Sequence, residues 1–391
     1  MFTADGGSIP LTDHQNLENK LGRIAERIKS QGKKRRFLAE TLKKAKNQIE
    51  ISADEEKSGI VESELVHPVQ ETPLENLVIA GVDGGVLSKP LHGLDLILLR
   101  SVGTVFYYNE EELKEADYHP SERPIPQLIN IHEPMDSREL DIRVGLERQL
   151  VELDCANEIA NNREIDALML DGSIVPQYVN HASSDKSREL YKKLINSFTN
   201  LYQTCTEKEI LLLGAVKDSR SARLANIFQK KIFPKLIENS DLSSDELSSL
   251  NKNMDVLTNS RDTAFLDYLL EAGERTFVFN YAEAPANLLE NLGDWSNRIR
   301  AFYMKPVPYD RPVRVEFISN QKDVVKKTNR IASLVTSLSA RHEACALPSV
   351  LIEADARAAL AKEEISILRD KIADQLEPST LLDLRRERRP F

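Results

Sequence analysis

Short hydrophobic runs between residues 77 and 216 predict a set of buried strands. The segments at 78–82, 167–170 and 210–216 read Val-Ile-Ala-Gly-Val, Ala-Leu-Met-Leu and Ile-Leu-Leu-Leu-Gly-Ala-Val. Continuous apolar runs of this length suit strands that are covered on both faces, as in a parallel sheet. Residues 138–159 and 186–206 have the length and spacing of helices, and each precedes one of the later two strands. The sequence therefore predicts strands joined by helical crossovers.

Two further apolar runs, 94–99 and 102–107, follow the first strand closely, with Gly103 near the turn. This spacing favours an antiparallel meander. Three strands close together, then a helix and a strand twice over, are the order of a ribonuclease H-like sheet. The predicted fold class is α/β: a ribonuclease H-like mixed sheet flanked by helices, with an N-terminal helical arm and C-terminal helices.

Residues 1–50 are predicted to form the helical arm. Thr12-Asp13-His14-Gln15 has the pattern of a capping box. An apolar stripe at heptad-like spacing follows, made of Leu17, Leu21, Ile24 and Ile28. A break near Gly32 and a basic run at 33–36 come before a second stripe, made of Phe37, Leu38, Leu42, Ala45 and Ile49. The arm is either a packing element, as a helical hairpin or one interrupted helix, or a surface for oligomerisation or partner docking.

The rest of the chain is predicted to be one large domain with a polar approach and a basic end. Residues 51–75 are acidic and polar and indicate a linker, and the proline-rich segment 109–137 indicates a long irregular connection. The main domain spans 76–375 and carries a polar insertion around 240–260. Its later elements are predicted strands at 276–280 and 313–318, a helix at 262–272, and final helices at 322–340 and 352–375. Residues 376–391 form a basic C-terminal tail.

Composition narrows the possible functions only modestly. The net charge of −10 argues against a protein that coats nucleic acid through bulk charge, although a local basic groove remains compatible with it. The three cysteines are scattered along the chain, at Cys155, Cys205 and Cys345. We therefore expect no zinc site, and we expect the protein to reside in a reducing compartment. Because neither a signal peptide nor a membrane-spanning run is recognisable, we expect a cytoplasmic protein without a membrane partner.

Two aspartates follow two of the predicted strands in nearly the same sequence context. Asp83 comes after Val-Ile-Ala-Gly-Val and Asp171 after Ala-Leu-Met-Leu, and each precedes a glycine. Parallel strands of an open α/β sheet present their carboxyl ends to one crevice. Neighbouring strands are about 4.8 Å apart, so the carboxylates would meet there. Such a pair suits hard divalent cations, although an isolated Asp-Gly is also a common strand-ending turn.

A third carboxylate is expected from the helix before the second of these strands. Glu147 interrupts the apolar row of this helix, where an unpaired charge would be costly, and it is our first choice. Glu152 and Asp154 are held in reserve. The structural alternative for Glu147 is a simple ion pair with Arg143, four residues earlier.

Three further residues are candidates at the same sheet edge. Asp355, near the start of a late helix, is a possible fourth ligand, although an acidic residue there also favours the helix dipole. His342 is a competing ligand or base. Lys217 follows the third parallel strand and could hold a phosphate or offset carboxylate repulsion, or simply be a solvated loop charge.

Taken together, these motifs resemble the NurA nuclease family. The matching pieces, in family order over about residues 75–375, include Gly-Val-Asp83-Gly-Gly, the Glu147-bearing helix, Leu-Asp171-Gly-Ser, Ala-Val-Lys217-Asp-Ser, Gly273-Glu-Arg-Thr-Phe-Val-Phe, Arg314-Val-Glu-Phe and Leu351-Ile-Glu-Ala-Asp355. The resemblance implies manganese-dependent DNA cleavage, with 5′-to-3′ exonuclease and single-strand endonuclease activity. It also implies a homodimer that works with HerA, a hexameric DNA-translocating ATPase, in DNA end resection, repair or defence against foreign DNA.

On this reading, Asp83, Glu147, Asp171 and Asp355 are the metal ligands and Lys217 steadies the phosphate. The cofactor would be Mn²⁺ or Mg²⁺, with two ions per active site. Two alternatives stay open. One is a catalytically degenerate DNA-binding or scaffold subunit of the ATPase. The other is an actin-like or sugar-kinase-type ATP-binding protein, because Asp-Gly-Gly after a strand also begins the phosphate loop of those folds.

Overall fold

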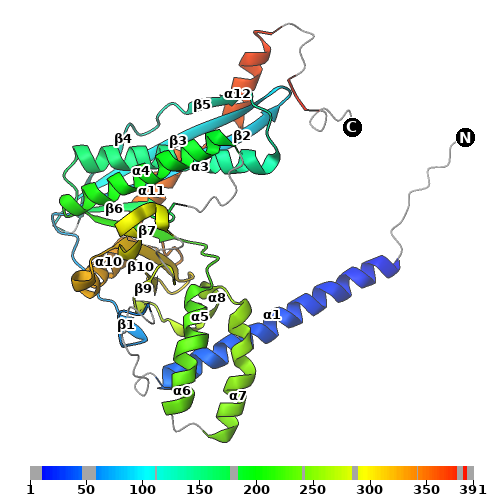
Figure 1. Cartoon of the computed structure of the whole chain (residues 1–391), viewed down its shortest axis with the longest axis vertical. Coiled ribbons are helices and arrows are strands. Elements are labelled where there is room, and N and C mark those ends of the chain that lie inside the picture. The colour runs from blue at the N-terminus through cyan, green and yellow to red at the C-terminus, as the bar shows by residue number, and fades with distance from the viewer. Residues whose placement is uncertain are drawn as a thin grey trace, which may run out of the picture. The chain divides into compact units, whose positions relative to one another are not determined.

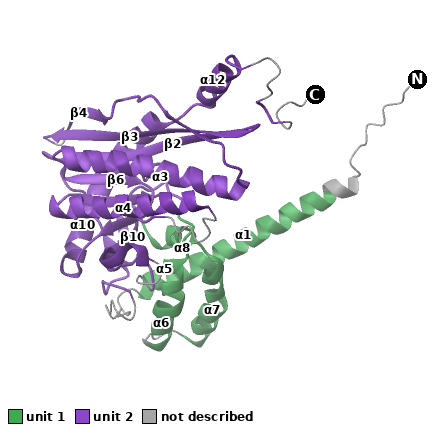
Figure 2. Ribbon diagram, turned by 45° about the horizontal axis from the view of Figure 1, so that its top comes forward, with its two compact units in different colours: residues 1–51, 219–271 green, residues 52–218, 272–391 purple. Residues whose placement is uncertain are grey.

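The computed structural model describes residues 11–45, 59–110, 112–176, 184–239, 243–283, 289–340, 342–376 and 382–384. The side chain of Thr12 in the predicted capping box, Ile49 of the second stripe, part of the predicted linker and most of the basic tail lie outside these residues. The chain divides into two compact units (Figure 2). One comprises residues 1–51 and 219–271, and the other comprises residues 52–218 and 272–391.

The first unit is helical and discontinuous in sequence. Its elements are α1 (Leu11–Ala45), α5 (Arg223–Ile227), the π-helix η1 (Phe228–Ile232), α6 (Phe233–Asn239), α7 (Ser244–Met254), the 3₁₀-helix η2 (Asp255–Asn259) and α8 (Asp262–Leu269). The predicted insertion around 240–260 is therefore part of a longer segment. That segment packs with the N-terminal arm.

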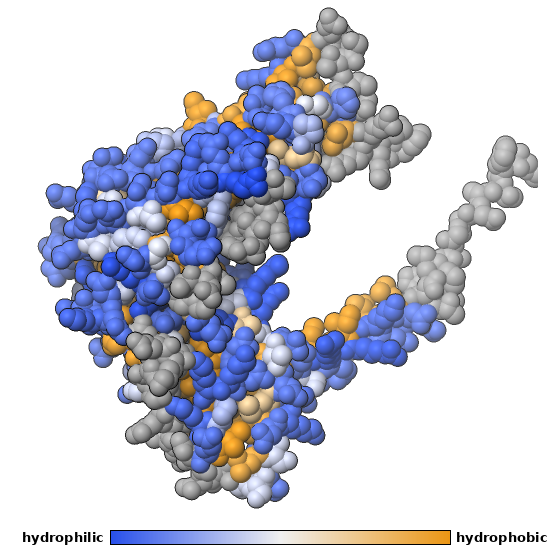
Figure 3. All heavy atoms as spheres, in the orientation of Figure 1, coloured by the Kyte–Doolittle hydropathy of each residue, from blue (hydrophilic) through white to orange (hydrophobic). Residues whose placement is uncertain are grey.

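Helix α1 is continuous through Gly32, where we had predicted a break. A Cβ at Gly32 would lie 3.2 Å from the Tyr268 hydroxyl oxygen, so this glycine permits close packing on α8. The second half of α1 buries Leu38 and Leu42 completely. The stripe in the first half is exposed by 55–63% and lies among the orange atoms along α1 in Figure 3; its members are Leu17, Leu21, Ile24 and Ile28.

The second unit is built on an eleven-stranded mixed sheet (Figure 1). The strand order is β1-β8-β10-β11-β7-β6-β2-β3-β4, while β5 pairs with β3 and β9 with β10. The bounds are β1 (Val66–Pro68), β2 (Val78–Leu91), β3 (Leu94–Asn109), β4 (Glu112–His119), β5 (Gln127–Ile131), β6 (Ala167–Asp171), β7 (Leu211–Val216), β8 (Glu274–Thr276), β9 (Phe279–Asn280), β10 (Ile299–Lys305) and β11 (Val313–Ile318).

The central strands have the predicted directions. β2 pairs antiparallel with β3 and parallel with β6, and β6 pairs parallel with β7. This confirms the predicted fold class, a mixed α/β sheet flanked by helices. The two runs predicted as separate strands form the single strand β3, and the proline-rich connection contributes β4 and β5. Residues 59–75, part of the predicted linker, instead supply β1 at the sheet edge and the buried Glu62.

Helices cover both faces of this sheet. α3 (Ser137–Asn162) and α4 (Asp185–Glu207) pack on one face, and α10 (Val324–Ser339) and α11 (Ser349–Ala358) on the other. The remaining elements are the 3₁₀-helices η3 (Glu290–Arg298) and η4 (Gln321–Asp323), and α12 (Lys362–Ala373), which packs on the outer part of the β2–β3 hairpin. The predicted final helix at 352–375 is thus two helices.

Glycines let both helical layers approach β2 closely. A Cβ at Gly81 would lie 3.0 Å from the Val350 backbone, and one at Gly85 would lie 2.3 Å from the Ala358 carbonyl oxygen, both on α11. A Cβ at Gly84 would meet α3 on the opposite face. The strand that carries Asp83 is therefore held between α3 and α11. None of the helices in the described part of the chain combines the length and apolarity that a bilayer-spanning segment requires.

Candidate metal centre

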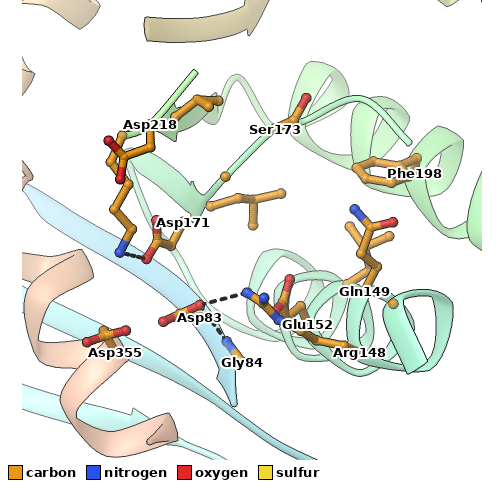
Figure 4. Close-up of a pocket in the computed structure, with 16 residues that line it drawn as sticks. Asp83, Gly84, Arg148, Gln149, Glu152, Asp171, Ser173, Phe198, Asp218 and Asp355 are labelled. Atoms are coloured by element: carbon orange, nitrogen blue, oxygen red, sulfur yellow. Dashed lines mark hydrogen bonds and ion pairs between the residues drawn. The ribbon is translucent and has the colours of Figure 1, made fainter. Parts of the chain in front are cut away.

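Three carboxylates converge at the carboxyl ends of the parallel strands. Asp83, Asp171 and Asp355 each offer an oxygen, and these oxygens lie within 4.8 Å of one another (Figure 4). Asp171 ends β6, as predicted. β2 continues beyond Asp83 as a hairpin with β3, but its parallel pairing with β6 ends at Val82 opposite Leu170. The next residue on each strand is the aspartate, so register places the two side by side.

Asp83 is the most buried member of this group, with 5% of its surface exposed. Burial, together with the negative charges of Asp171 and Glu152, raises the pKa of Asp83 to about 8. The Gly84 backbone N–H donates to Asp83 Oδ1 at 2.7 Å and partly opposes this rise. The site therefore holds more negative charge than it can stabilise by itself, and a bound cation would relieve the repulsion.

Lys217 lies directly beside the aspartates. Its Nζ is 2.7 Å from Asp171 Oδ2, and about half of the Lys217 side chain remains exposed. Burial lowers the pKa of Lys217, but the ion pair with Asp171 outweighs it, so the net pKa is raised and the amine is a fixed positive charge. Asp355 comes from α11, which packs on the face of the sheet opposite to α3, and it is exposed.

Helix α3 contributes Arg148 and Glu152 rather than Glu147. Arg148 Nε donates to Glu152 Oε1 at 2.6 Å, and a terminal nitrogen of Arg148 lies 3.5 Å from Asp83 Oδ1. Burial raises the pKa of Glu152 to about 7, against the lowering effect of Arg148. Glu152, one of the two reserve candidates, thus faces the aspartates.

The structure does not bring Glu147 into this group. Its carboxylate is 3.7 Å from Arg143 Nε, which is the ion pair considered as the structural alternative. The apolar residues around Glu147 belong to a second row of α3, Leu140, Val144 and Val151, which packs on β3 and β5. Glu152 is five residues further along, which turns it to a different face of the helix.

Two other candidates are also placed elsewhere. Asp154 is exposed and lines a separate polar groove between α3 and α4. His342 accepts a hydrogen bond from the Ala344 backbone N–H at 3.2 Å in a surface turn and does not line the pocket. Both residues are explained by their local structure.

The aspartates open into a cavity of about 520 Å³. One end holds the carboxylates and Lys217, and the opposite end is lined by Gln149, Ser173 and Phe198 (Figure 4). Arg148 and Glu152 lie between the two ends. A cavity with carboxylates at one end and an aromatic ring beside uncharged polar groups at the other can hold a charged phosphate together with an uncharged group attached to it.

The turn after Asp171 is held by a buried carboxylate that the sequence did not reveal. Glu316 on β11 accepts from Ser173 Oγ at 2.6 Å and from the Ile174 backbone N–H at 3.2 Å, and it pairs with Arg314 at 2.9 Å. The turn reaches Glu316 by crossing β7 at Gly214, where a Cβ would lie 2.4 Å from the Gly172 carbonyl oxygen. The available signal was the pair of charged residues, Arg314 and Glu316, in a strand whose other residues are apolar.

The donors present fit a hard divalent cation. Asp83, Asp171 and Asp355 offer only carboxylate oxygens, which suit Mg²⁺ and Mn²⁺ better than softer metals. Glu152 adds a fourth carboxylate close to Asp83. Burial and the neighbouring carboxylate charges both raise the pKa of Asp83, and a bound cation would offset both effects.

A family model described as "NurA domain" matches residues 77–360 of this chain. The chain belongs to the NurA family of nucleases. The match covers the central parallel strands and ends shortly after α11, so all four carboxylates lie within it. No curated protein gives a significant match.

One solved NurA structure shares this fold at low sequence identity, and two further structures align more weakly. The NurA nuclease from Sulfolobus solfataricus aligns with a TM-score of 0.54 and 14% identity, over 93% of this chain and 99% of that one. A NurA bound to dAMP and manganese aligns with a TM-score of 0.45 and 12% identity, over 92% and 98% of the two chains. Endonuclease V from Bacillus subtilis aligns more weakly, with a TM-score of 0.32 and 14% identity, over 85% of this chain and 91% of that one.

Proposed function

We propose that this NurA-family nuclease is a divalent-metal-dependent deoxyribonuclease with Asp83, Asp171, Asp355 and Glu152 as its metal ligands. The observation that carries the proposal is the convergence of three aspartate oxygens within 4.8 Å of one another beside a lysine. Glu152 replaces Glu147 as the proposed ligand from α3 because it packs against Gly84, next to Asp83, and lines the cavity. The proposed cofactor is Mn²⁺ or Mg²⁺, with two ions per site.

Bound cations would lower the pKa of a coordinated water and stabilise the leaving oxygen of the phosphodiester. The chain's own residues supply the remaining requirements. The carboxylates hold their oxygens toward one another from strands and helices whose packing keeps them in place. Lys217 is charged and half exposed at the cavity mouth, where its amine can donate to a phosphate oxygen.

The family resemblance extends the proposal beyond the active site. We propose 5′-to-3′ exonuclease and single-strand endonuclease activity in the cytoplasm, with a HerA-type hexameric ATPase as partner, in end resection, repair or anti-phage defence. We also propose a homodimer. The exposed apolar stripe on α1 supports the existence of a protein contact there, because such residues gain stability when a partner covers them.

Incubation of the purified chain with end-labelled single- and double-stranded DNA, with and without Mn²⁺, tests the proposal. Cleavage should require the cation, and Asp83→Asn or Asp171→Asn should abolish it while the circular dichroism spectrum stays unchanged. Asp154→Asn is the matched control, because Asp154 is an exposed aspartate of α3 outside the cavity. A wild-type chain that binds the ATPase but never cuts DNA would favour the scaffold alternative. The ATP-binding alternative has no support from the family finding.

A further inference from the structure

Arg148 is the arginine that lines the cavity, and it is held by two of the proposed metal ligands. Its Nε contacts Glu152 Oε1 at 2.6 Å, and a terminal nitrogen lies 3.5 Å from Asp83 Oδ1. In Figure 4 the guanidinium points toward Asp83. Thus a side-chain cation of the protein itself occupies part of the carboxylate cluster.

A second arginine of the same helix shows that this arrangement is not a general property of α3. Arg143 is 7% exposed and pairs with Glu133 and Glu147, away from the cavity. Arg148 is 39% exposed. A structural ion pair would be expected to resemble Arg143, whereas Arg148 is open to whatever enters the cavity.

The contacts of Arg148 compete with metal binding. An oxygen of Asp83 or Glu152 that donates its lone pairs to a divalent cation is less available to the guanidinium, and two positive charges at one carboxylate repel each other. Binding of cations by these carboxylates therefore weakens the hold on Arg148. The guanidinium then faces the cavity with unused N–H donors, whose planar fork matches the oxygens of a phosphate.

We propose that Arg148 is a phosphate-binding residue that Asp83 and Glu152 retain until the cations bind, so that metal binding transfers it to the DNA backbone. This inference rests on the proposed function and deepens it, because it names a further residue that contacts the substrate. It also predicts opposite changes in two affinities. Without Arg148, the carboxylates should bind metal more tightly and the loaded protein should bind DNA more weakly.

The test compares wild type with Arg148→Met, which keeps a linear side chain without charge, and with Arg148→Lys, which keeps the charge but lacks the fork. Mn²⁺ affinity is measured by calorimetry without DNA. Affinity for a fluorescent single-stranded oligonucleotide is measured by anisotropy with Ca²⁺ and with EDTA, and a gel confirms that the oligonucleotide is intact. Thermal unfolding checks that each variant is folded.

Arg148→Met should bind Mn²⁺ severalfold more tightly and bind DNA in Ca²⁺ about tenfold more weakly, as expected for the loss of one charged phosphate contact. In EDTA its DNA affinity should equal that of wild type, because Arg148 is then occupied. In Ca²⁺, the DNA affinity of Arg148→Lys should lie between those of wild type and Arg148→Met. Arg143→Met, which removes the arginine outside the cavity, should change neither affinity.

Unchanged or weaker Mn²⁺ binding by Arg148→Met would overturn the inference, as would an unchanged DNA affinity in Ca²⁺. Equal effects of Arg143→Met would also overturn it, because they would show a structural role. The proposed function fails in a different way, through a wild-type chain that neither binds Mn²⁺ nor cuts DNA. Should Arg148→Met not fold, the same comparisons with Arg148→Lys decide the matter.

Discussion

Gly84 lies so close to Glu152 that a Cβ at residue 84 would be 2.6 Å from both Cγ and Oε1 of Glu152. The glycine after Asp83 is therefore required by packing between β2 and α3, and not by a turn. Because β2 continues as an extended strand through residue 84, the backbone there would accept any residue. The absent side chain makes room for the carboxylate.

We predict that Gly84→Ala displaces Glu152 and weakens metal binding. The added methyl must push the Glu152 side chain aside or separate β2 from α3, and such overpacking costs about 1–3 kcal/mol of unfolding free energy. Mn²⁺ affinity should fall by about 10- to 100-fold, as for other changes that disturb the setting of a ligand. Calorimetry and urea unfolding measure the two effects.

Gly22→Ala is the control for Gly84→Ala. Gly22 lies in α1 with no atom within 4 Å of the added Cβ, so alanine there should stabilise the helix by up to about 1 kcal/mol and leave Mn²⁺ binding unchanged. If Gly84→Ala binds Mn²⁺ as tightly as wild type, the close contact does not position Glu152.

A second prediction separates the two glutamates of α3. Glu152→Gln should lower the cleavage rate by more than the roughly 10- to 100-fold that loss of an outer partner of a ligand costs, because a ligand itself is removed. Glu147→Gln should leave the rate unchanged, because Glu147 pairs with Arg143 outside the cavity. Single-turnover cleavage of end-labelled DNA compares them. The reverse ranking would restore Glu147 as the ligand.

The central strands and their aspartates could be predicted from sequence because burial on both faces leaves a plain apolar run. β6 and β7 were found in this way, and Asp171 follows from the end of β6. Edge strands lack this signal. β4 exposes most of its residues, and β1 has only three, so neither has an apolar run to detect. Strand β10, which carries the buried Arg300, was also not predicted.

The choice between Glu147 and Glu152 could not be settled from sequence for a different reason. α3 buries one apolar row that includes Leu146 and Leu153, and a second row that includes Val144 and Val151. With apolar residues on two sides, the pattern does not show which side faces the aspartates. The discontinuous helical unit was hidden as well, because nothing in residues 219–271 indicates that they pack with α1 rather than with the sheet.

A third prediction concerns pH in the absence of metal. The pKa of Asp83 is about 8 in the fold, against an ordinary value near 3.8, so the folded chain binds more protons than the unfolded chain between these values. Its contribution to stability is therefore lost as the pH rises through this window, at about 1.4 kcal/mol per pH unit at most. Glu152, with its pKa raised to about 7, acts in the same direction.

Urea unfolding in EDTA at pH 5.5 and pH 8.5 measures this dependence. Because other groups titrate too, the quantity to compare is the stability of wild type minus that of Asp83→Asn. The stability of wild type should fall relative to that of Asp83→Asn at the higher pH. Asp83 must ionise in the folded chain there, whereas asparagine carries no ionisable group. A constant difference would show that Asp83 titrates at its ordinary value. Added Mn²⁺ should stabilise wild type more at pH 8.5 than at pH 5.5, because protons compete with the cation.

The last prediction concerns Glu316, whose side chain is 2% exposed and fastens the turn after Asp171. Glu316→Gln replaces one accepting oxygen by a donating amide and removes the charged group that pairs with Arg314. Breaking a buried ion pair costs about 3–5 kcal/mol, so the variant should be less stable. The turn at Gly172, whose φ is +130°, should then lose its hydrogen bonds to β11. Mn²⁺ affinity should fall because Asp171, the residue before this turn, loses its fixed position.

Glu62→Gln distinguishes this local effect from a general loss of stability. Glu62 is also a buried carboxylate, paired with Arg275 at 2.7 Å and accepting from the Val278 backbone N–H at 2.9 Å. It lies beside β8, near the β1 edge of the sheet and away from β6 and β2, which carry Asp171 and Asp83. Both variants should lose similar stability in urea, while only Glu316→Gln should lose Mn²⁺ affinity. Equal losses of Mn²⁺ affinity would mean that metal binding depends on overall stability, and that the turn needs no anchor of its own.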